Sequence, residues 1–394
     1  MSDISQQGLI CTLQRLREHP TLDGELTRLT REHPAALILP CHAGEFARPA
    51  LRNILAELSR APFFSEVIVP ANGLDAGEAA RARAFLAERL RLPHRLLWCD
   101  PVVATLPGVR PGKGSNVWLA LGLLAREGRV RFVLTADADV TTFRLEMLAR
   151  LLFALAHPEA GFQFAKSYYP RVSDRIYGRV TRLFVAPLLQ ALIRVAGHFP
   201  LLDFLASFRY PLAGECGMTL ELARALPLES GWGLEVGMLC ELFRRTEPRA
   251  VCQVDAGIAY DHKHQPLGDG MRGLVKMSGE IARTLLAQLA REGLRLDAHL
   301  LDALPGAYRR EAGEAVRFSG ALARINALPF DAGAEADAIH LFARALEEAI
   351  GQGTLPPPLP AWKSPEAPDW SAVNASGIDD FSLISGVDSP EMKR

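Results

Sequence analysis

The sequence predicts an α/β protein with a mixed, mostly parallel sheet flanked by helices, and with a helical C-terminal extension. Three observations support this fold class. Short apolar runs alternate with helical patterns through the first half of the chain, polar residues follow several of these runs, and residues 266–350 are mainly helical in pattern. Strands that alternate with helices form βαβ units with right-handed crossovers.

Each element follows from its own pattern. The predicted strands of the first half are 35–40, 65–72, 94–100 and 131–139, and the helices between them are 48–60, 77–91 and 114–127. Beyond residue 140 the pattern predicts helix 143–156, strand 161–169, a long helical stretch over 173–208, loop 210–217, helix 219–226, turn 230–235, a helix to about 246 and strand 249–257. In the extension, apolar residues recur near one helical face, at Leu274, Met277, Ile281, Leu285 and Leu289.

These patterns divide the chain into four regions. Residues 1–34 form an N-terminal helical segment, 35–265 the sheet domain, and 266–350 the helical C-terminal region. The last region, 351–394, is rich in Pro, Ser, Asp and Gly, which predicts a mobile tail. The apolar faces of the helical region could pair two subunits, so we expect a homodimer.

Composition excludes several protein classes. Of 394 residues, 49% are hydrophobic and 23% charged, which is typical of globular rather than disordered proteins. The net charge of −1, from 44 Lys and Arg against 45 Asp and Glu, argues against a nucleic-acid partner. The six cysteines form no C-x-x-C pair, so we expect buried thiols in a reducing cytoplasm rather than a zinc ribbon or disulfide framework.

Neither the N-terminus nor the most apolar stretch of the chain predicts membrane insertion. The N-terminus lacks the basic and apolar regions of a signal peptide. The most apolar stretch, 185–206, is interrupted by Arg194, His198, Pro200 and Asp203, whereas a membrane span needs about 20 mostly apolar residues. We therefore expect a soluble, cytoplasmic protein without a transmembrane segment.

The strongest chemical signal is Asp137-Ala138-Asp139, at the end of an apolar run. In an extended chain the two aspartates share one face. Two carboxylates at such a short distance repel each other unless a cation or hydrogen-bond donors compensate for their charge. A divalent ion such as Mg²⁺ or Mn²⁺ that bridges a diphosphate would do so. The alternative is that Asp139 caps helix 143–156.

A second signal is PGKGSN, residues 111–116, at the start of a helix. Gly112 and Gly114 allow the backbone to approach a phosphate, Lys113 adds a positive charge, and a helix start favours anions. The pattern is not a Walker A loop. The alternative is a basic loop before Ser115 as the N-cap.

A basic run, KSYYPRVSDRIYGRVTR, follows. Within one helix Arg175, Arg179 and Arg182 would share a face suited to a phosphate or carboxylate, and Gly178 hints at close backbone approach. The alternative is a solvated helix face.

Two further motifs lie later in the chain. The turn GWGLE places Trp232 and Glu235 where they could bind a sugar, or they could be a core tryptophan and a capping glutamate. In DHKH, residues 261–264, a histidine beyond a strand end could bind a metal or a phosphate, or be structural.

Taken in chain order, these motifs resemble those of the glucosyl-3-phosphoglycerate synthase family, which are retaining GT-A glycosyltransferases of family 81 with mannosyl-3-phosphoglycerate synthase relatives. The resemblance runs from Ala35 to Leu289. It rests on PGKG, the D-x-D, FAKSYYPR, GRVTRLFVAPLL, YPLAGE, GWGLEVG and the histidine after the late strand. The resemblance implies a GT-A, Rossmann-like sheet domain over 35–265.

The resemblance also implies residue roles. The nucleotide sugar would be bound by Pro40, Cys41, His42, Glu45, Asn72, Lys113, Asp137, Ala138 and Trp232. The acceptor would be bound by Gly178, Arg179, Thr181, Gly214, Glu215 and His264. Asp139 and His262 would bind Mg²⁺ or Mn²⁺, and Asp139, Glu235 and Lys113 would be catalytic. The chain departs from the family pattern in its first loop, CHAGE after Pro40, and in having Ala138 between the two aspartates.

The implied reaction moves a hexose, with glucose favoured, from a nucleotide sugar, with UDP-glucose favoured, to the 2-hydroxyl of 3-phosphoglycerate. The transfer retains the anomeric configuration by same-face attack and serves synthesis of a glucosylglycerate-type compatible solute. The alternatives are a mannosyl-3-phosphoglycerate synthase, a glucosylglycerate synthase that uses free glycerate, a sugar-nucleotide-forming nucleotidyltransferase, a peripheral-membrane transferase with a lipid acceptor, and a nucleotide-sugar sensor without turnover.

Overall fold

The computed structural model describes residues 8–257, 260–261, 266–268, 272–352 and 356–368. The chain forms two compact units and enters each of them more than once. The sheet unit comprises Arg17–Ala165, Glu215–Ala225 and Pro360–Arg394, and the helical unit comprises Met1–Leu16, Lys166–Gly214 and Leu226–Leu359. The units divide the chain at positions other than residues 35, 266 and 351, so the four sequence regions stay a prediction.

The sheet unit is built on a mixed, mostly parallel sheet, as the sequence predicts. Its strands are β2 (Ala35–Ile38), β3 (Cys41–His42), β4 (Glu66–Asn72), β5 (His94–Trp98), β6 (Phe132–Thr135) and β8 (Cys216–Thr219). Their order is β8-β6-β2-β4, and β3 and β5 also pair with β4. Every pair is parallel except β6 with β8, which is antiparallel. Buried residues fill β2 and β6 completely, which is typical of strands covered on both faces.

Helices connect these strands. They are α1 (Leu22–Glu32), the 3₁₀ turn η2 (Ala43–Ala47), α2 (Pro49–Leu58), α3 (Ala76–Arg89), α4 (Cys99–Thr105), α5 (Lys113–Glu127), α6 (Leu145–Ala156) and α9 (Leu220–Ala225). Local sequence explains their ends: Asp75 and Glu78 form a capping box at α3, and Gly128 ends α5 in the left-handed conformation.

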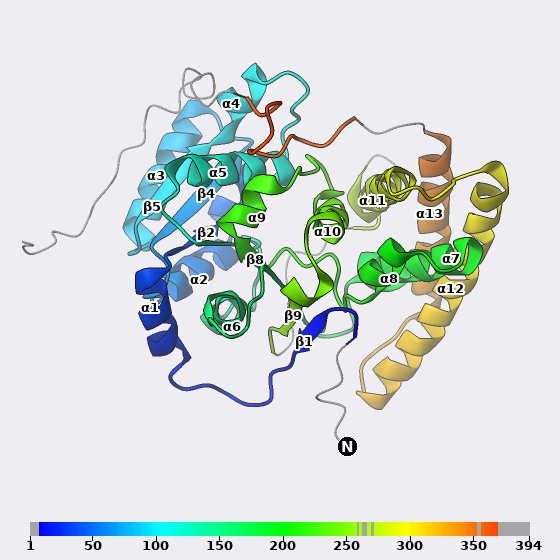
Figure 1. Cartoon of the computed structure of the whole chain (residues 1–394). Coiled ribbons are helices and arrows are strands. Elements are labelled where there is room, and N and C mark those ends of the chain that lie inside the picture. The colour runs from blue at the N-terminus through cyan, green and yellow to red at the C-terminus, as the bar shows by residue number, and fades with distance from the viewer. Residues whose placement is uncertain (1–7, 258–259, 262–265, 269–271, 353–355, 369–394) are drawn as a thin grey trace, which may run out of the picture. The chain divides into compact units, whose positions relative to one another are not determined.

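The helical unit contains a short parallel pair, β1 (Cys11–Leu13) with β9 (Val251–Asp255). Strand β7 (Phe164–Tyr168) leads the chain into this unit, where the Ala256 amide donates to the Tyr168 carbonyl oxygen. The helices are η3 (Val180–Val185, a π-helix), α7 (Ala186–Ala196), α8 (Pro200–Ala206), α10 (Leu234–Arg245), the turn η4 (Pro248–Ala250), α11 (Gly273–Arg291), α12 (Ala298–Ile325) and α13 (Ala332–Gly351). Helix α12 packs against α7 and α13, and α13 also packs against α11 (Figure 1).

Most predicted elements lie within a few residues of their observed bounds, but the helical stretch over 173–208 is wrong in part. Residues 171–178 form an irregular turn with a bridge between Val172 and Ile176, and helix begins only at Arg179. Strands β1, β3 and β8 and helix α4 were not predicted. Strand β8 is only four residues long and lies in what the Pro and Gly residues around it predict to be a loop.

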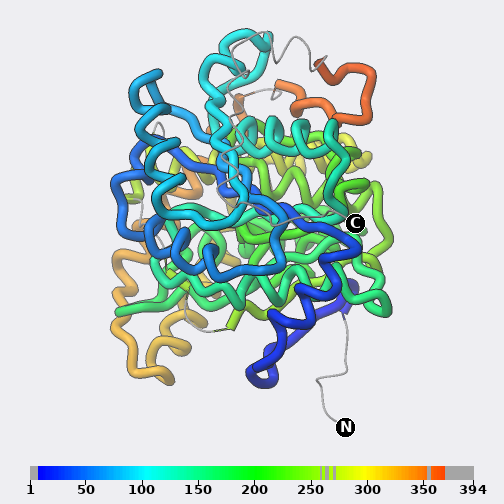
Figure 2. The backbone as a smooth tube through the Cα atoms, turned by 90° about the vertical axis from the view of Figure 1, so that its left-hand side faces the viewer, coloured from blue at the N-terminus to red at the C-terminus, as the bar shows by residue number. Residues whose placement is uncertain are grey.

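The prediction of a mobile tail is wrong for residues 356–368. The Trp362 ring stacks on Trp118 of α5 with 4.5 Å between ring centroids. Each indole donates a hydrogen bond to a backbone oxygen of the other segment, Trp118 Nε1 to Pro360 at 2.7 Å and Trp362 Nε1 to Trp118 at 2.8 Å. Figure 2 shows this orange segment beside the cyan helices of the sheet unit. Residues 353–355 and 369–394 lie outside the described residues.

Candidate active site

The predicted donor-binding residues of the first two strand ends are brought together by one strand pairing. Strand β3 pairs with the end of β4, in a register that sets Cys41 beside Ala71 and His42 beside Asn72. Pro40 separates β3 from β2, and it cannot donate a ladder hydrogen bond. Cys41 is buried, whereas His42 is exposed and Asn72 half-buried at the sheet edge. This edge is where a parallel sheet binds ligands.

The loop after β3 is held by short-range contacts. The Gly44 amide donates to Nδ1 of His42 at 3.3 Å, so in the neutral ring the proton lies on Nε2. That edge of the imidazole lies against Gly73, where a Cβ would approach Nε2 to 2.7 Å. Glu45 pairs with Arg48 at 3.5 Å. The residues at which this loop differs from the family pattern are therefore held in a defined structure.

Lys113 lies at the start of α5 and reaches the aspartate motif. Its Nζ is 2.6 Å from Oδ1 of Asp137. Gly112 is the N-cap of α5, so the alternative of Ser115 as N-cap is wrong. Ser115 is buried inside the helix and donates to the Gly112 carbonyl oxygen at 2.9 Å. The start of α5 thus presents Lys113 to the carboxylates that follow β6.

The two aspartates lie in a turn rather than in the strand. Strand β6 ends at Thr135, so the expected alternation along an extended chain is wrong at Asp137 and Asp139. Ala138 between them is buried. Helix α6 has Arg144 as its N-cap, so the alternative of Asp139 as a cap is wrong too. Helix capping therefore does not explain the aspartate motif.

Asp139 lies among other acidic groups. Burial, together with the charges of Asp137, Glu45 and Glu215, raises the pKa of Asp139 to about 7 against the opposing effect of Lys113. Glu215 is fully buried and accepts a hydrogen bond from the Asp137 amide at 3.4 Å. Carboxylates that outnumber nearby cations in this way are stabilised by a divalent cation.

The donor set fits Mg²⁺ or Mn²⁺, which prefer oxygen ligands. Among the described residues no group of three His, Cys, Asp or Glu side chains is arranged to hold a metal ion. Of the two predicted ligands, Asp139 is described, and His262 lies outside the described residues together with His264. The metal assignment therefore stays a prediction.

The predicted acceptor residues Gly178, Arg179 and Thr181 begin the first helix of the helical unit. Gly178 has a φ of +74°, and a Cβ there would lie 3.3 Å from Cγ of Arg171, so this backbone favours glycine. Thr181 Oγ1 is buried and has no hydrogen-bond partner among the described residues. An unpaired buried hydroxyl requires a partner such as water or an anion.

The predicted arginine face is wrong for Arg175, whereas Arg179 and Arg182 do point to one common partner. Arg175 lies in the turn before the helix and pairs with Asp174, its neighbour in the chain. Arg179 and Arg182 both bind the carboxylate of Glu335 from α13, at 3.0 Å and 2.6 Å respectively. Two guanidinium groups share one carboxylate, which leaves this cluster with a surplus positive charge. The alternative of a solvated helix face is also wrong, because the Arg182 side chain is only 16% exposed.

The turn that carries Trp232 is fitted tightly against α11. A Cβ on Gly233 would lie 2.0 Å from Oγ1 of Thr284, and one on Gly231 would lie 2.6 Å from Oε2 of Glu280. The Trp232 amide donates to that same Glu280 oxygen at 3.0 Å. Trp232 is itself 37% exposed, which argues against the alternative of a core tryptophan.

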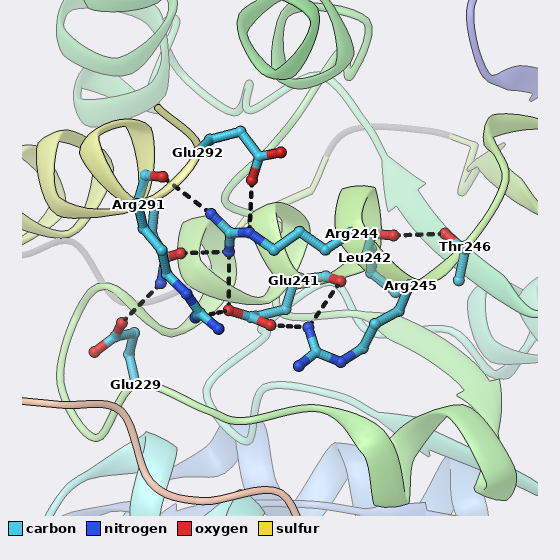
Figure 3. A network of polar contacts seen from close by, with 9 residues as sticks. Glu229, Glu241, Leu242, Arg244, Arg245, Thr246, Arg291 and Glu292 are labelled. Carbon is cyan, nitrogen blue, oxygen red and sulfur yellow. Dashed lines mark hydrogen bonds and ion pairs between the residues drawn. The ribbon is translucent and has the colours of Figure 1, made fainter. Parts of the chain in front are cut away.

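Helix α10, which begins next to this turn, is anchored to α11 by a polar network. Figure 3 shows Glu241 of α10 among Arg244, Arg245 and Arg291. Arg244 also donates to Glu292 at 2.7 Å. The network fixes the helix whose first turn carries the buried Glu235.

Gly214 and Glu215 are neighbours in the sequence but belong to different units. Gly214 is buried in the helical unit, where the buried Lys166 donates to the neighbouring Ala213 carbonyl oxygen at 2.6 Å. Glu215 lies in the sheet unit beside Asp137.

Among the residues that contact predicted site residues, several were not predicted. Asn116 contacts Asn72, Glu335 contacts Arg179, and Glu280 contacts the Trp232 amide. Asn116 lies within the PGKGSN motif and could have been found there. Glu335 and Glu280 lie in helices whose pattern gives no sign of such contacts.

Comparison with known proteins identifies the family. No family model matches the chain. The glucosyl-3-phosphoglycerate synthase of Persephonella marina is 35% identical over 362 residues, which cover 89% of this chain and 90% of that protein. That of Methanococcoides burtonii is 32% identical over 332 residues, 80% of this chain and 81% of that protein. The chain belongs to the glucosyl-3-phosphoglycerate synthase family.

Solved structures agree with this assignment. The glucosyl-3-phosphoglycerate synthase of Mycobacterium tuberculosis in complex with Mn²⁺, UDP-glucose and phosphoglyceric acid superimposes with a TM-score of 0.57 at 28% identity, over 73% of this chain and 89% of that chain. The same enzyme has been solved with Mg²⁺ and UDP, and superimposes with a TM-score of 0.55 at 26% identity over 74% of this chain and 89% of that chain. The predicted resemblance, fold class and enzyme class, a metal-dependent glycosyltransferase, are confirmed. In the part of the chain that the structure describes, every helix is too short or too polar to cross a bilayer.

Proposed function

We propose that this chain transfers glucose from UDP-glucose to the 2-hydroxyl of 3-phosphoglycerate, with retention of the anomeric configuration and release of UDP. The observation that carries the proposal is the 35% identity to a glucosyl-3-phosphoglycerate synthase over nearly the whole of both chains. The cluster of Lys113, Asp137 and Asp139 beyond β6 adds independent support, because a diphosphate leaving group requires such charges.

The donor is bound at the edge of the sheet unit. Pro40, Cys41, His42, Glu45 and Asn72 line the uracil and ribose, and Asp137 and Ala138 contact the ribose and the sugar side. Lys113 holds the phosphates through its positive charge. Asp139 and His262 would hold a divalent cation, which would neutralise the charge that develops on the leaving diphosphate.

The acceptor is bound by residues of the basic run and of the later motifs of the chain. The phosphate of 3-phosphoglycerate binds to Gly178, Arg179 and Thr181. The buried Thr181 hydroxyl, which has no hydrogen-bond partner in the part of the chain that the structure describes, supports this role. Gly214, Glu215, Trp232, Glu235 and His264 surround the transferred glucose and the acceptor. Glu235 orients hydroxyl groups and stabilises positive charge on the sugar, and the leaving phosphate accepts the proton of the attacking hydroxyl.

A grid of donors and acceptors tests the proposal. UDP-glucose, GDP-glucose and GDP-mannose are each combined with 3-phosphoglycerate or with free glycerate, in the presence of Mg²⁺, Mn²⁺ or a chelator. The expected result is that UDP forms most rapidly from UDP-glucose with 3-phosphoglycerate, and only with metal. Faster turnover of GDP-mannose would indicate a mannosyl-3-phosphoglycerate synthase instead, and faster turnover of free glycerate would indicate a glucosylglycerate synthase. Release of pyrophosphate would indicate a nucleotidyltransferase.

The assembly and the compartment belong to the same proposal. Phe318, Leu322 and Ile325 lie at helical spacing on α12 and are 70%, 40% and 83% exposed, so this face supports a homodimer built on the helical region. All six cysteines are free, which suits a reducing cytoplasm. The product feeds synthesis of a glucosylglycerate-type compatible solute.

A further inference from the structure

Asn116 is a buried amide that the proposed reaction does not use. It lies in the first turn of α5 and is 1% exposed. Its Nδ2 donates to three oxygens: the Asn72 side-chain oxygen at 2.9 Å, and the backbone carbonyls of Cys41 and Pro70, each at 3.4 Å. One side chain thus connects α5 to the end of β4 and to β3.

The two backbone carbonyls fix which way the Asn116 amide points. A carbonyl oxygen can only accept, so the atom of Asn116 that faces Cys41 and Pro70 has to be the nitrogen. The reverse orientation would set Oδ1 3.4 Å from two other oxygens. Because the nitrogen of Asn116 also faces Asn72, the atom of Asn72 nearest to it has to be the oxygen.

This orientation determines what Asn72 presents to a ligand. With its Oδ1 held by Asn116, the Asn72 side chain turns its NH₂ group away from α5. This group makes no hydrogen bond among the described residues, and Asn72 is half-buried at the sheet edge beside His42. Asn72 therefore offers a hydrogen-bond donor, and no acceptor, to a ligand at this edge.

We propose that Asn116 is a positioning residue that fixes the amide of Asn72 as a donor, and that this pair selects a nucleobase with a carbonyl group over one with an amino group at the same ring position. The inference rests on the proposed function in one respect, that Asn72 contacts the base of the donor. Uracil and cytosine differ in this way, since uracil has a carbonyl oxygen at C4 where cytosine has an amino group. A fixed N–H donor binds the carbonyl and opposes the amino group.

Two variants separate this role from a purely structural one. In Asn72→Asp the outward nitrogen becomes an oxygen of similar size, so the group that faces the base changes from donor to acceptor while Asn116 can still donate to the inner oxygen. In Asn116→Ala the Asn72 amide is free to rotate. The matched control is Asn53→Ala, which removes an asparagine whose Nδ2 donates to a backbone oxygen, that of Phe143 at 3.4 Å, elsewhere in the sheet unit.

The readout is the ratio of the dissociation constants of CDP and UDP, measured by calorimetry with Mn²⁺, with folding checked by thermal unfolding. The added charge of Asn72→Asp acts on both nucleotides and cancels in this ratio. We expect the wild type and Asn53→Ala to prefer UDP, and both test variants to reduce the preference about tenfold, the value of one hydrogen bond to the base. If Asn116→Ala does not fold, Asn72→Asp alone decides.

A wild type without preference for UDP, or an unchanged ratio in Asn72→Asp, would overturn the inference. Since the readout is binding, it does not depend on turnover. A protein that shows the expected ratios and yet transfers no glucose to 3-phosphoglycerate would contradict the proposed function and leave the inference standing.

Discussion

Lys113 Nζ lies 2.6 Å from Oδ1 of Asp137, and this contact joins the start of α5 to the turn after β6. Both side chains keep partial exposure, 29% for Lys113 and 24% for Asp137, so the pair stays accessible to a ligand. Asp137 in turn contributes to raising the pKa of Asp139. The contact therefore couples the predicted phosphate-binding cation to the predicted metal-binding motif.

Replacing Lys113 with Met removes the charge and keeps the length of the side chain. We expect kcat with UDP-glucose and 3-phosphoglycerate to fall about a hundredfold, because one preorganised charge at a leaving group contributes this much. The control is Lys363→Met, which removes a lysine that pairs with Glu221 on the surface of the same unit. A Lys113→Met enzyme within twofold of wild type would contradict the assignment.

Asp139→Asn keeps the shape of the side chain and removes its charge. Turnover should fall below detection and binding of Mn²⁺, measured by calorimetry in the presence of UDP, should weaken at least about tenfold, because a charged oxygen ligand is lost. Asp302→Asn, at an exposed position of α12, serves as the control. Undiminished metal binding and activity in Asp139→Asn would remove the metal site from this motif. His262→Ala should behave like Asp139→Asn.

The turn before η3 offers a matched pair of arginines. Arg179→Ala should raise KM for 3-phosphoglycerate at least about tenfold and leave KM for UDP-glucose nearly unchanged, since an arginine–phosphate contact is lost. Arg175→Ala should change neither constant, because Arg175 is exposed and pairs with Asp174, its neighbour in the chain. Equal effects of Arg179→Ala on both substrates would argue against an acceptor phosphate at this helix.

Glu335→Gln tests the cluster that holds Arg179. The Glu335 side chain is 7% exposed and binds two arginines, so the loss of its charge leaves two guanidinium groups without their carboxylate. We expect the free energy of unfolding to fall by about 2 kcal/mol, less than for a fully buried pair because the arginines are partly exposed. Urea denaturation measures this change, and a stability equal to that of wild type would show that the pair contributes nothing.

The segment 356–368 should stabilise the sheet unit. Trp362→Ala removes the ring that stacks on Trp118 and should lower the free energy of unfolding by about 3 kcal/mol. Gly122→Ala should also destabilise, because its Cβ would lie 2.2 Å from the Trp362 ring. Glu366→Ala, at an exposed position of the same segment, is the control and should unfold like the wild type. Equal stability of Trp362→Ala and wild type would restore the prediction of a loosely attached tail.

Sequence alone predicts the parts of the fold and site that depend on neighbouring residues. Apolar runs predict β2, β4, β5 and β6 because buried strands consist of such runs, and strand ends predict that the loop residue His42 and Asn72 come together. Asp137, which helps to raise the pKa of Asp139, likewise lies only two positions before it in the sequence.

Contacts between distant segments could not be predicted. Glu335 is 156 residues from Arg179, and no local pattern marks it as the partner of that arginine. Similarly, the composition of 351–394 predicts mobility, whereas Trp362 is held by the fit of its ring to Gly122 and Trp118 of α5. The prediction for Arg175 is wrong for a different reason, because the helix that was expected to contain Arg175 begins four residues later.

The most direct test of the central claim is the ¹H NMR spectrum of the product formed from UDP-glucose and 3-phosphoglycerate with Mn²⁺. The account predicts an α-glucoside, the configuration of glucose in UDP-glucose, linked to the 2-hydroxyl of 3-phosphoglycerate, with one UDP released per glucoside. A β-glucoside, or a product in which the 2-hydroxyl remains free, would contradict it.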